Sequence, residues 1–361
     1  MDYLELHRDA LVVDCHNDTI VAHIRHGNAS LEPERGGDAP APQRRGAPPD
    51  GPADGPGRRH SGTVAWLRGP APAPPEGQAA LQASLPQLRR GGVDAGLFAV
   101  DVTRAYQNHL AYALDGLGYF LNDVEQRGAG VTVARRADDV VRAKAAGELA
   151  AILAIEHADA TERSLNVLRA LYEVGVRAIG LTHHTSSWAA DGCFEAREGV
   201  GLTHYGTQLV GEMNRLGMLV DLAHASEAAF FSALEASARP VAFSHGNARA
   251  LCDHPRNLTD AQLRALAANG GVIGVSYVPA FVDRQAPTIE RLLDHIDHIV
   301  AVAGIGTVAL GGDFDGGGTL LADAAEVPRL TKGLVDRGYA EGDIRKILGL
   351  NALRVLRATI G

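Results

Sequence analysis

Residues 11–18 read LVVDCHND, an apolar run that ends abruptly in acidic, imidazole and amide side chains. The run predicts a buried β-strand with polar groups gathered at its end. Similar short apolar runs recur along the chain and alternate with longer stretches of helical period, which is the pattern of βα units around a parallel sheet. They predict eight strands, at residues 10–14, 94–100, 150–156, 176–182, 217–223, 240–244, 271–277 and 307–313. Eight strands that are each followed by a helix predict an α/β fold, the (β/α)8 TIM barrel.

The composition is that of a globular protein without a nucleic-acid partner. The chain has 361 residues, 46% of them hydrophobic, and a formal net charge of −9, with no basic block to neutralise phosphates. It shows no apolar signal segment and no uninterrupted apolar stretch of about 18 residues, the length that crosses a bilayer. We therefore expect a cytoplasmic protein without membrane contact, and a homodimer is compatible with the sequence. The three cysteines have no metal-finger spacing and are expected to be free thiols.

One segment departs from this composition. Residues 33–75 hold most of the chain's 17 prolines, mixed with glycine and arginine. Such a stretch buries too little apolar surface to offset its ordering entropy, so we expect a mobile Pro/Gly-rich insertion after the first strand, within a single domain of residues 1–361. Whether this insertion covers the end of the first strand as a lid or acts as a spacer is left open by its sequence.

Polar side chains stand at the ends of most predicted strands. They are His16 and Asp18 after the first, Glu156 at the third, His183 and His184 after the fourth, His224 after the fifth, His245 after the sixth, Tyr277 at the seventh, and Asp313 and Asp315 at the eighth. A lone histidine in such a place is usually an ordinary hydrogen-bonded residue, so the prediction depends on the recurrence. In a TIM barrel these strand ends meet at one rim. Imidazoles and carboxylates that converge there predict a divalent metal site.

Several motifs, in order along the chain, carry a resemblance to a known family. At HND, IEHADA, LTHHTSSWA, GLTHYGTQLVGEMNRLGMLVDLAHAS, FSHGN, HPRNLTD and GGDFDG, the sequence resembles the membrane dipeptidase (renal dipeptidase) family of zinc peptidases, which are amidohydrolase-type metal barrels. The resemblance runs from about residue 6 to the C-terminus and leaves out the Pro-rich insertion. It implies two Zn²⁺ ions, or similar divalent ions, per chain. The implied metal ligands are His16 and Asp18 for one ion, His224 and His245 for the other, and Glu156 as the bridge.

The resemblance also implies roles in catalysis and substrate binding. It places His183 at the substrate carbonyl, Arg256 on the substrate carboxylate and Asp313 in proton transfer, and we add Tyr277 to the substrate-binding set. A carboxylate that bridges two metals leaves a water between them with a depressed pKa. We therefore expect a binuclear zinc-dependent dipeptidase that hydrolyses dipeptides with a free C-terminal carboxylate through a metal-bridging hydroxide. The resemblance favours Asp313, the first aspartate of GGDFDG, over Asp315 as the proton carrier, and Asp315 is equally explained by a turn.

The sequence differs from the family pattern at two positions, and two alternative functions remain open. Glu156 is followed by His157 where the family is commonly rich in glycine, so an imidazole is expected to narrow the pocket or to compete for metal. D-L-A-H replaces the more usual D-L-S-H before the second-metal site. One alternative is another metal-barrel hydrolase acting on an amide, lactone or phosphoester, which would not need Arg256. The other is a catalytically silent binding barrel, which would be expected to lack metal ligands.

Overall fold

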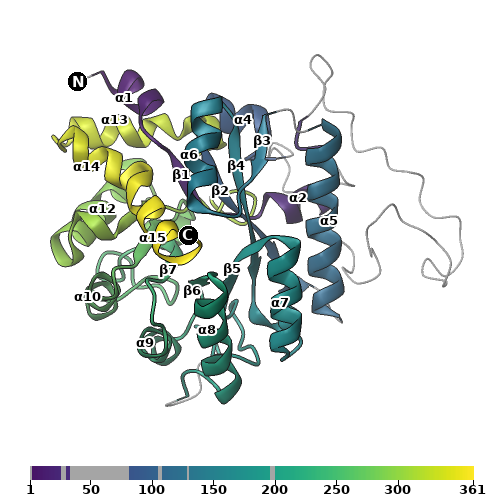
Figure 1. The fold of residues 1–361 in the computed structure, drawn as a ribbon. Helices are drawn as coiled ribbons and strands as arrows, with labels where there is room; N and C mark the ends of the chain where they lie inside the picture. The colour runs from purple at the N-terminus through teal and green to yellow at the C-terminus, as the bar shows by residue number, and fades with distance from the viewer. Residues whose placement is uncertain (1, 26–29, 33–80, 105–107, 128–129, 196–199) are drawn as a thin grey trace, which may run out of the picture.

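The computed structural model describes residues 2–25, 30–32, 81–104, 108–127, 130–195 and 200–361 (Figure 1). The segment 33–75, predicted as a mobile insertion, lies outside the described residues. Within the described ranges, no helix combines the length and the apolar character that crossing a membrane requires.

A closed parallel barrel forms the centre of the described structure. Its eight strands are β1 (Val13–Asn17), β2 (Ala95–Asp101), β4 (Leu149–Glu156), β5 (Val176–Gly180), β6 (Leu219–Asp221), β7 (Ala242–Gly246), β8 (Val272–Val275) and β9 (Val308–Leu310). Each strand pairs with its neighbours in parallel, and the pairings of β2 with β4 and of β1 with β9 complete the ring. The predicted (β/α)8 fold is confirmed.

The strand boundaries correct the sequence prediction in two places. A further strand, β3 (Val131–Val133), pairs with β4 beside the barrel and was not predicted, because three half-buried residues give too short a pattern. The first strand was predicted at 10–14 but runs to Asn17, because its ladder with β2 continues past the apolar residues as far as the pair Asn17 and Phe98. His16 therefore lies inside a strand, as does His245 in β7.

Helices surround the barrel, and most of them begin and end at residues that favour a helix boundary. They are α1 (Tyr3–Asp9), α2 (Thr19–Arg25), α4 (Leu85–Arg90), α5 (His109–Arg127), α6 (Ala137–Ala146), α7 (Leu165–Val174), α8 (His204–Leu216), α9 (Glu227–Ala236), α10 (Asp260–Asn269), α11 (Pro279–Val282), α12 (Ile289–Ala303), α13 (Pro328–Asp336), α14 (Glu341–Arg345) and α15 (Asn351–Thr359). The side chains of Thr203 and Ser226 cap α8 and α9, and Gly217 ends α8 in the left-handed conformation.

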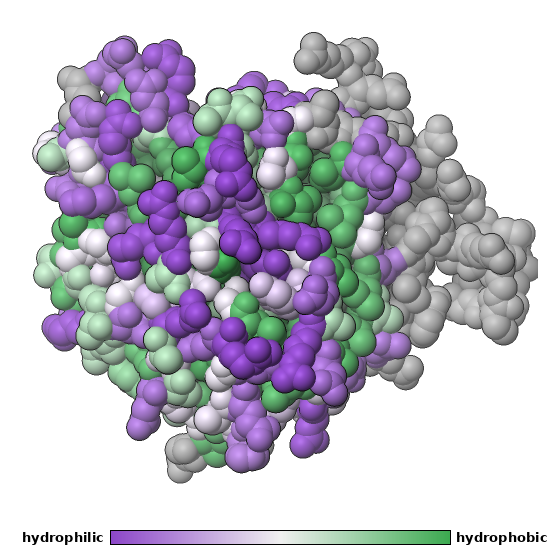
Figure 2. All heavy atoms as spheres, in the orientation of Figure 1, coloured by the Kyte–Doolittle hydropathy of each residue, from purple (hydrophilic) through white to green (hydrophobic). Residues whose placement is uncertain are grey.

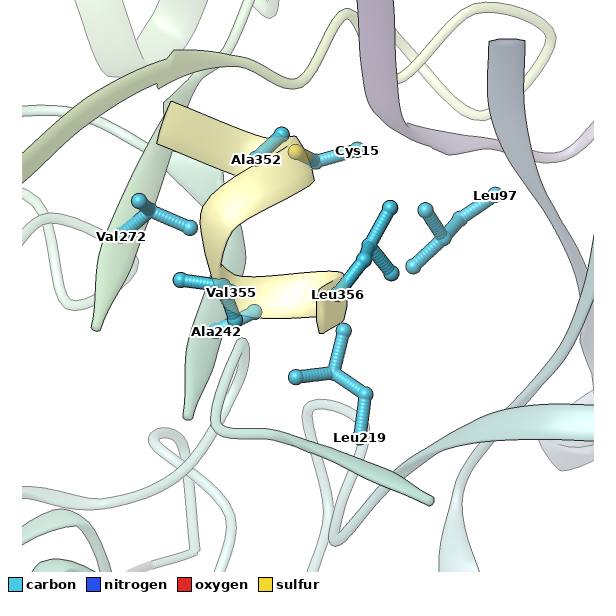
Figure 3. Close-up of a pocket in the computed structure, with 8 residues that line it drawn as sticks. All are labelled: Cys15, Leu97, Leu219, Ala242, Val272, Ala352, Val355 and Leu356. Atoms are coloured by element: carbon cyan, nitrogen blue, oxygen red, sulfur yellow. The ribbon is translucent and has the colours of Figure 1, made fainter. Parts of the chain in front are cut away.

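Helix α15 closes the N-terminal end of the barrel, at the centre of the ring of helices in Figure 1. Val355 and Leu356 of this helix face Cys15, Leu97 and Leu219 of the strands across a small apolar hollow (Figure 3). The surface on this side mixes hydrophilic and apolar residues (Figure 2). Because apolar side chains fill this end, the polar strand ends must meet at the opposite, C-terminal end of the barrel.

Candidate active site

The predicted metal ligands lie together around the carboxylate of Glu156, the last residue of β4. The Nε2 atom of His224 lies 2.8 Å from Glu156 Oε1, and the Nε2 atoms of His245 and His16 lie 3.7 Å and 3.9 Å from the same oxygen. His16 Nε2 also lies 3.9 Å from Asp18 Oδ2. All five side chains are buried. Donor atoms from different parts of the barrel wall therefore converge on one place.

Several of these buried donor atoms have no hydrogen-bond partner among the described residues. They are Nε2 of His16, Oδ1 of Asp18 and Oε1 of Glu156. Leaving a buried polar atom unpaired costs free energy, and a divalent cation would satisfy all three. Two sets of ligand atoms, His16 with Glu156 and His245, and His16 with Asp18 and Asp313, each lie within 4.8 Å of one another. Imidazole nitrogens and carboxylate oxygens are the ligands that zinc and similar ions accept, so the residues fit such a centre.

A hydrogen-bond chain fixes which nitrogen of His245 faces the centre. Oγ of Ser244 donates its hydrogen to Oδ2 of Asp221 at 2.5 Å, and Nδ1 of His245 lies 2.9 Å from the same Oγ. Because the serine hydrogen is used on Asp221, Nδ1 of His245 is the donor to Ser244, and Nε2 keeps its lone pair. This Nε2 lies 2.9 Å from Nε2 of His224. Burial is the main cause that lowers the pKa of both imidazoles, which favours the neutral form that binds metal.

The His16 side of the centre is strongly anionic. Burial opposes protonation of His16, but the carboxylates of Glu156, Asp18 and Asp313 outweigh it and raise the pKa of the imidazole to about 10. Burial raises the pKa of Asp313 to about 7 and also raises the pKa of Glu156 well above its usual range. These carboxyl groups lie close together in a buried site, which disfavours their ionised forms. A bound cation would stabilise the ionised carboxylates.

The loop after β9 brings Asp313 into this group and keeps Asp315 out of it. Asp313 has φ 57°, its N–H donates to the His16 carbonyl oxygen at 3.0 Å, and the N–H groups of residues 316–318 donate to its own carbonyl. Asp315 pairs with Gln82 instead: Oδ1 accepts from the Gln82 N–H at 2.7 Å, and the Asp315 N–H donates to Gln82 Oε1 at 2.8 Å. Asp315 thus anchors the loop, whereas Asp313 faces the metal ligands.

His183 stands beside Glu156 as a neutral imidazole. Its Nε2 atom lies 3.9 Å from Glu156 Oε2, and its ring stacks on His224 with 4.2 Å between the ring centres. Burial lowers the pKa of His183 to about 4, so the ring is uncharged near pH 7. A neutral imidazole here can donate one hydrogen bond to an oxygen atom bound over the centre. The neighbouring His184 packs between His224 and Phe194.

Arg256 places a buried positive charge next to the centre. Its side chain is 0% exposed, and its guanidinium lies 5.8 Å and 5.3 Å from the ring centres of Phe243 and Phe281. Nη2 donates to the carbonyl oxygen of His245 at 3.1 Å, whereas Nε and Nη1 have no partner in the part of the chain that the structure describes. A buried guanidinium with unused N–H groups is suited to a planar anion such as a carboxylate.

Comparison with known proteins agrees with this geometry. Residues 60–360 match the family described as membrane dipeptidase, peptidase family M19. The chain belongs to this family. This M19 chain is 37% identical over 231 residues to dipeptidase tcpJ of Claviceps purpurea, covering 62% of the chain and 54% of that protein. It is 37% identical over 219 residues to dipeptidase 3 of Rattus norvegicus, covering 58% and 45%. The chain spans about half the length of the curated relatives it matches.

Solved structures share the barrel over almost the whole M19 chain. A metallo peptidase from Rhodobacter sphaeroides, liganded with a phosphinate mimic of the dipeptide L-Ala-D-Ala, superposes with a TM-score of 0.77 at 25% identity, covering 97% of this chain and 100% of that one. The probable dipeptidase PvdM from Pseudomonas aeruginosa has a TM-score of 0.77 at 21% identity, covering 99% and 97%. At that identity the second likeness is one of fold.

Three polar residues at the centre of this M19 chain were not predicted. Asp101, the last residue of β2, is paired in register with Glu156, and its carboxylate lies within 4.8 Å of ligand atoms of Glu156 and His183. The sequence could have predicted Asp101, because the strand AGLFAVD ends in an acidic residue as the strand that ends in Glu156 does. Asp221 and Ser244 gave no such signal, since their role depends on the contact between neighbouring strands.

Tyr277, predicted to bind substrate, follows β8, and its N–H donates to the carbonyl oxygen of Gly312 in the loop that carries Asp313. Its side chain is buried, and its ring packs on Phe314 with 5.3 Å between the ring centres. Burial raises the pKa of its phenol, and the carboxylate of Asp14 in β1 raises it further. A substrate contact of Tyr277 stays a prediction.

Proposed function

We propose that this M19 chain is a metal-dependent dipeptidase that holds two zinc or similar divalent ions and hydrolyses dipeptides with a free C-terminal carboxylate. Five proposed ligand side chains lie together at Glu156, more than one tetrahedral zinc ion accepts, and this supports the binuclear centre. Relatives named as dipeptidases support the reaction, as does the dipeptide mimic bound to the Rhodobacter sphaeroides neighbour. When bound, the cations would supply an acidified water and polarise the scissile carbonyl.

The chain's own residues divide the work of holding that centre. The Nε2 atoms of His16, His224 and His245 lie 2.8–3.9 Å from Oε1 of Glu156, and we assign His16 with Asp18 to one ion and His224 with His245 to the other. Burial and the hydrogen bond to Ser244 keep the second-side imidazoles neutral and correctly oriented.

The buried Arg256 is the observation that favours a substrate with a carboxylate. A full buried charge is unfavourable unless an anion meets it, and Nε and Nη1 of Arg256 have no partner among the described residues. The charges of Asp313 and Glu156 both act on the guanidinium, so a carboxylate bound there would lie beside the proposed metal centre. Recognition of a free α-carboxylate beside the centre would limit the substrate to one residue beyond the scissile bond. Dipeptides meet this requirement, and long peptides do not.

We assign proton transfer to Asp313 and stabilisation of the negatively charged carbonyl oxygen to His183. A carboxyl with a pKa of about 7 can take a proton from the attacking water and give it to the leaving amine near neutral pH. The neutral His183 donates to the carbonyl oxygen as negative charge develops on it.

Metal analysis and a substrate panel on one purified sample test this function. We expect about two divalent ions per chain by mass spectrometry, with hydrolysis of free dipeptides and little hydrolysis of lactones or phosphoesters. Arg256→Ala should cost about 2–5 kcal/mol in kcat/KM on free dipeptides, because it removes a buried charge partner of the carboxylate. C-terminally amidated dipeptides are the control and should lose far less. Equal losses on both substrates, or activity only on lactones or phosphoesters, would contradict the proposal.

A further inference from the structure

A buried histidine interrupts the apolar face of α12, which belongs to the ring of helices around the barrel (Figure 1). The buried residues of this helix are Leu292, Leu293, His295, Ile296 and Ile299, and the side chain of His295 is 0% exposed. Burying an imidazole among leucine and isoleucine side chains costs free energy unless its nitrogens are hydrogen-bonded. The partners of His295 therefore indicate why a polar residue stands here.

Both ring nitrogens of His295 bond to backbone groups, and the two groups belong to different segments. The N–H of Ala248, after β7, donates to Nδ1 at 3.1 Å, so the hydrogen of the neutral ring is on Nε2. This Nε2 donates to the carbonyl oxygen of Val282, the last residue of α11, at 2.8 Å. Burial lowers the pKa of the imidazole, which favours this neutral form. His295 thus joins the segment after β7 to α11.

The segment after β7 folds back on itself and carries Arg256 near its end. The N–H of Leu258 donates to the carbonyl oxygen of Asn247 at 2.9 Å, and the N–H of Arg249 donates to the carbonyl oxygen of Leu258 at 2.7 Å. Ala248 and Leu258 pair as a parallel bridge between these bonds. Because Arg256 lies two residues before Leu258, a displacement of Ala248 would displace the backbone that carries the guanidinium.

The other segment, α11, holds an aromatic ring against that guanidinium. The ring centre of Phe281 lies 5.3 Å from the guanidinium of Arg256, and Val282 is the next residue in the chain. Asn257, which follows Arg256, donates to the carbonyl oxygen of Phe281 at 2.8 Å. The two segments therefore meet at Arg256, and His295 holds both of them from α12.

The guanidinium itself has few hydrogen bonds to fix it. Nη2 of Arg256 donates to the carbonyl oxygen of His245, and the other two nitrogens have no partner within the described ranges. A side chain that is anchored at one nitrogen depends on its backbone and on the surrounding walls for its position. A binding group must be held to within about 0.5 Å for its full effect, and supporting hydrogen bonds provide that precision.

We propose that His295 is a positioning residue for Arg256. By joining Ala248 to Val282, it keeps the guanidinium and the ring of Phe281 in the arrangement that receives the carboxylate of the substrate. This inference rests on the proposed dipeptidase function, and it adds a residue of an outer helix to the carboxylate site.

The test replaces His295 by phenylalanine, which keeps a planar ring but removes both hydrogen bonds. In His295→Phe, we expect kcat/KM for Ala-Ala to fall about 10–100-fold, mainly through a higher KM, because small displacements of a binding group are costly. Hydrolysis of C-terminally amidated Ala-Ala, which lacks the carboxylate, should change little, and both metals should stay bound. His295→Asn and His295→Gln can each keep one of the two hydrogen bonds, so they should lose less, and they provide the same comparison if His295→Phe does not fold.

A double-mutant cycle shows whether the effect passes through the guanidinium. Residues that act through one another have non-additive effects. In a chain that already carries Arg256→Ala, adding His295→Phe should therefore cause almost no further loss of kcat/KM on Ala-Ala.

His7→Phe is the matched control, because His7 is also a buried histidine with both ring nitrogens bonded. Its Nδ1 lies 2.7 Å from Thr331 Oγ1, and its Nε2 lies 2.8 Å from the carbonyl oxygen of Gly91, which precedes β2 on the N-terminal side of the barrel. This variant should lower the melting temperature but keep the wild-type ratio of kcat/KM between free and amidated Ala-Ala.

Three results would overturn the inference and leave the dipeptidase function intact. They are equal losses on free and amidated Ala-Ala in the His295 variants, additive losses in the double variant, and loss of metal from His295→Phe. A wild type that holds two metals but cleaves no dipeptide would instead refute the proposed function.

Discussion

Gly316 has no side chain because two carboxylates occupy the space where its Cβ atom would be. A Cβ atom added there would lie 2.1 Å from Oδ2 of Asp18 and 2.2 Å from Oδ1 of Asp313. Atoms do not approach so closely, so an alanine must displace at least one of these carboxylates from its place beside His16. We predict that Gly316→Ala weakens metal binding about 10–100-fold and lowers kcat accordingly, while the barrel still folds. Metal per chain after dialysis against limiting zinc measures the effect.

Gly118 provides the matched control for this substitution. It lies within α5, where an added Cβ atom meets nothing within 4 Å. Gly118→Ala should keep full metal content and raise the melting temperature slightly, because alanine favours a helix over glycine. Equal metal content in Gly316→Ala and the wild type would show that the two carboxylates can move apart without loss.

Much of the candidate site could be predicted from the types of residue that stand at the strand ends. The five proposed metal ligands, with His183 and Asp313, belong to the imidazoles and carboxylates that recur at the strand ends, and the family resemblance selects them from that larger set. Asp313 and Asp315 could not be separated in this way, because side chains two residues apart point alike along a strand. Their difference arises from left-handed backbone conformations, φ 57° and 65°, in a turn that the sequence pattern does not encode.

At the scale of elements, the contact between β6 and β7 orients one imidazole of the centre. Asp221 ends β6, and Ser244 and His245 lie side by side in β7, so the hydrogen-bond chain exists only when the two strands pair. We predict that Ser244→Ala weakens zinc binding about 10–100-fold, because His245 loses the partner that fixes its tautomer and ring orientation. Zinc titration against a competing chelator measures the change.

Ser237→Ala is the control for this effect. Ser237 ends α9 on the approach to β7, and its hydroxyl donates to the Arg239 carbonyl oxygen at 2.8 Å, away from the centre. This variant should bind zinc as the wild type does. If both serine variants bind zinc equally well, the chain from Asp221 to His245 has no part in orienting the ligand.

The order of the elements was predictable, but their edges were not. Short continuous apolar runs, separated by amphipathic stretches, identified all eight barrel strands, because strands buried on both faces are apolar at successive positions. The strand boundaries depended on hydrogen-bond partners that lie far away in sequence. β1 continues to Asn17 because β2 continues beside it, although the last residues of β1 are polar. The strand β3 was missed for the opposite reason, since its pairing with β4 involves three residues only.

At the scale of the whole molecule, the two ends of the barrel have different tasks. Apolar side chains and α15 fill the N-terminal end. At the C-terminal end, buried carboxylates and imidazoles lie close together, and the like charges of the carboxylates repel one another. Buried groups with repelling charges lower the stability of the folded chain, and a cation that binds only the folded arrangement restores it. The proposed metal centre is therefore expected to matter for stability as well as for chemistry.

Metal removal should consequently lower the melting temperature of the whole barrel. The ligands come from β1, β4, the residues after β6, and β7, so a bound ion links segments from around the ring. At a free zinc concentration 1,000 times the dissociation constant, linkage adds about 4 kcal/mol to the free energy of unfolding. We predict a fall of several degrees in melting temperature after treatment with a chelator, and its recovery when zinc is added back, measured by scanning calorimetry. Glu156→Gln, which weakens the shared ligand, should melt at nearly the same temperature with and without zinc. A wild type whose melting temperature ignores both chelator and zinc would contradict the binding of metal to this cluster.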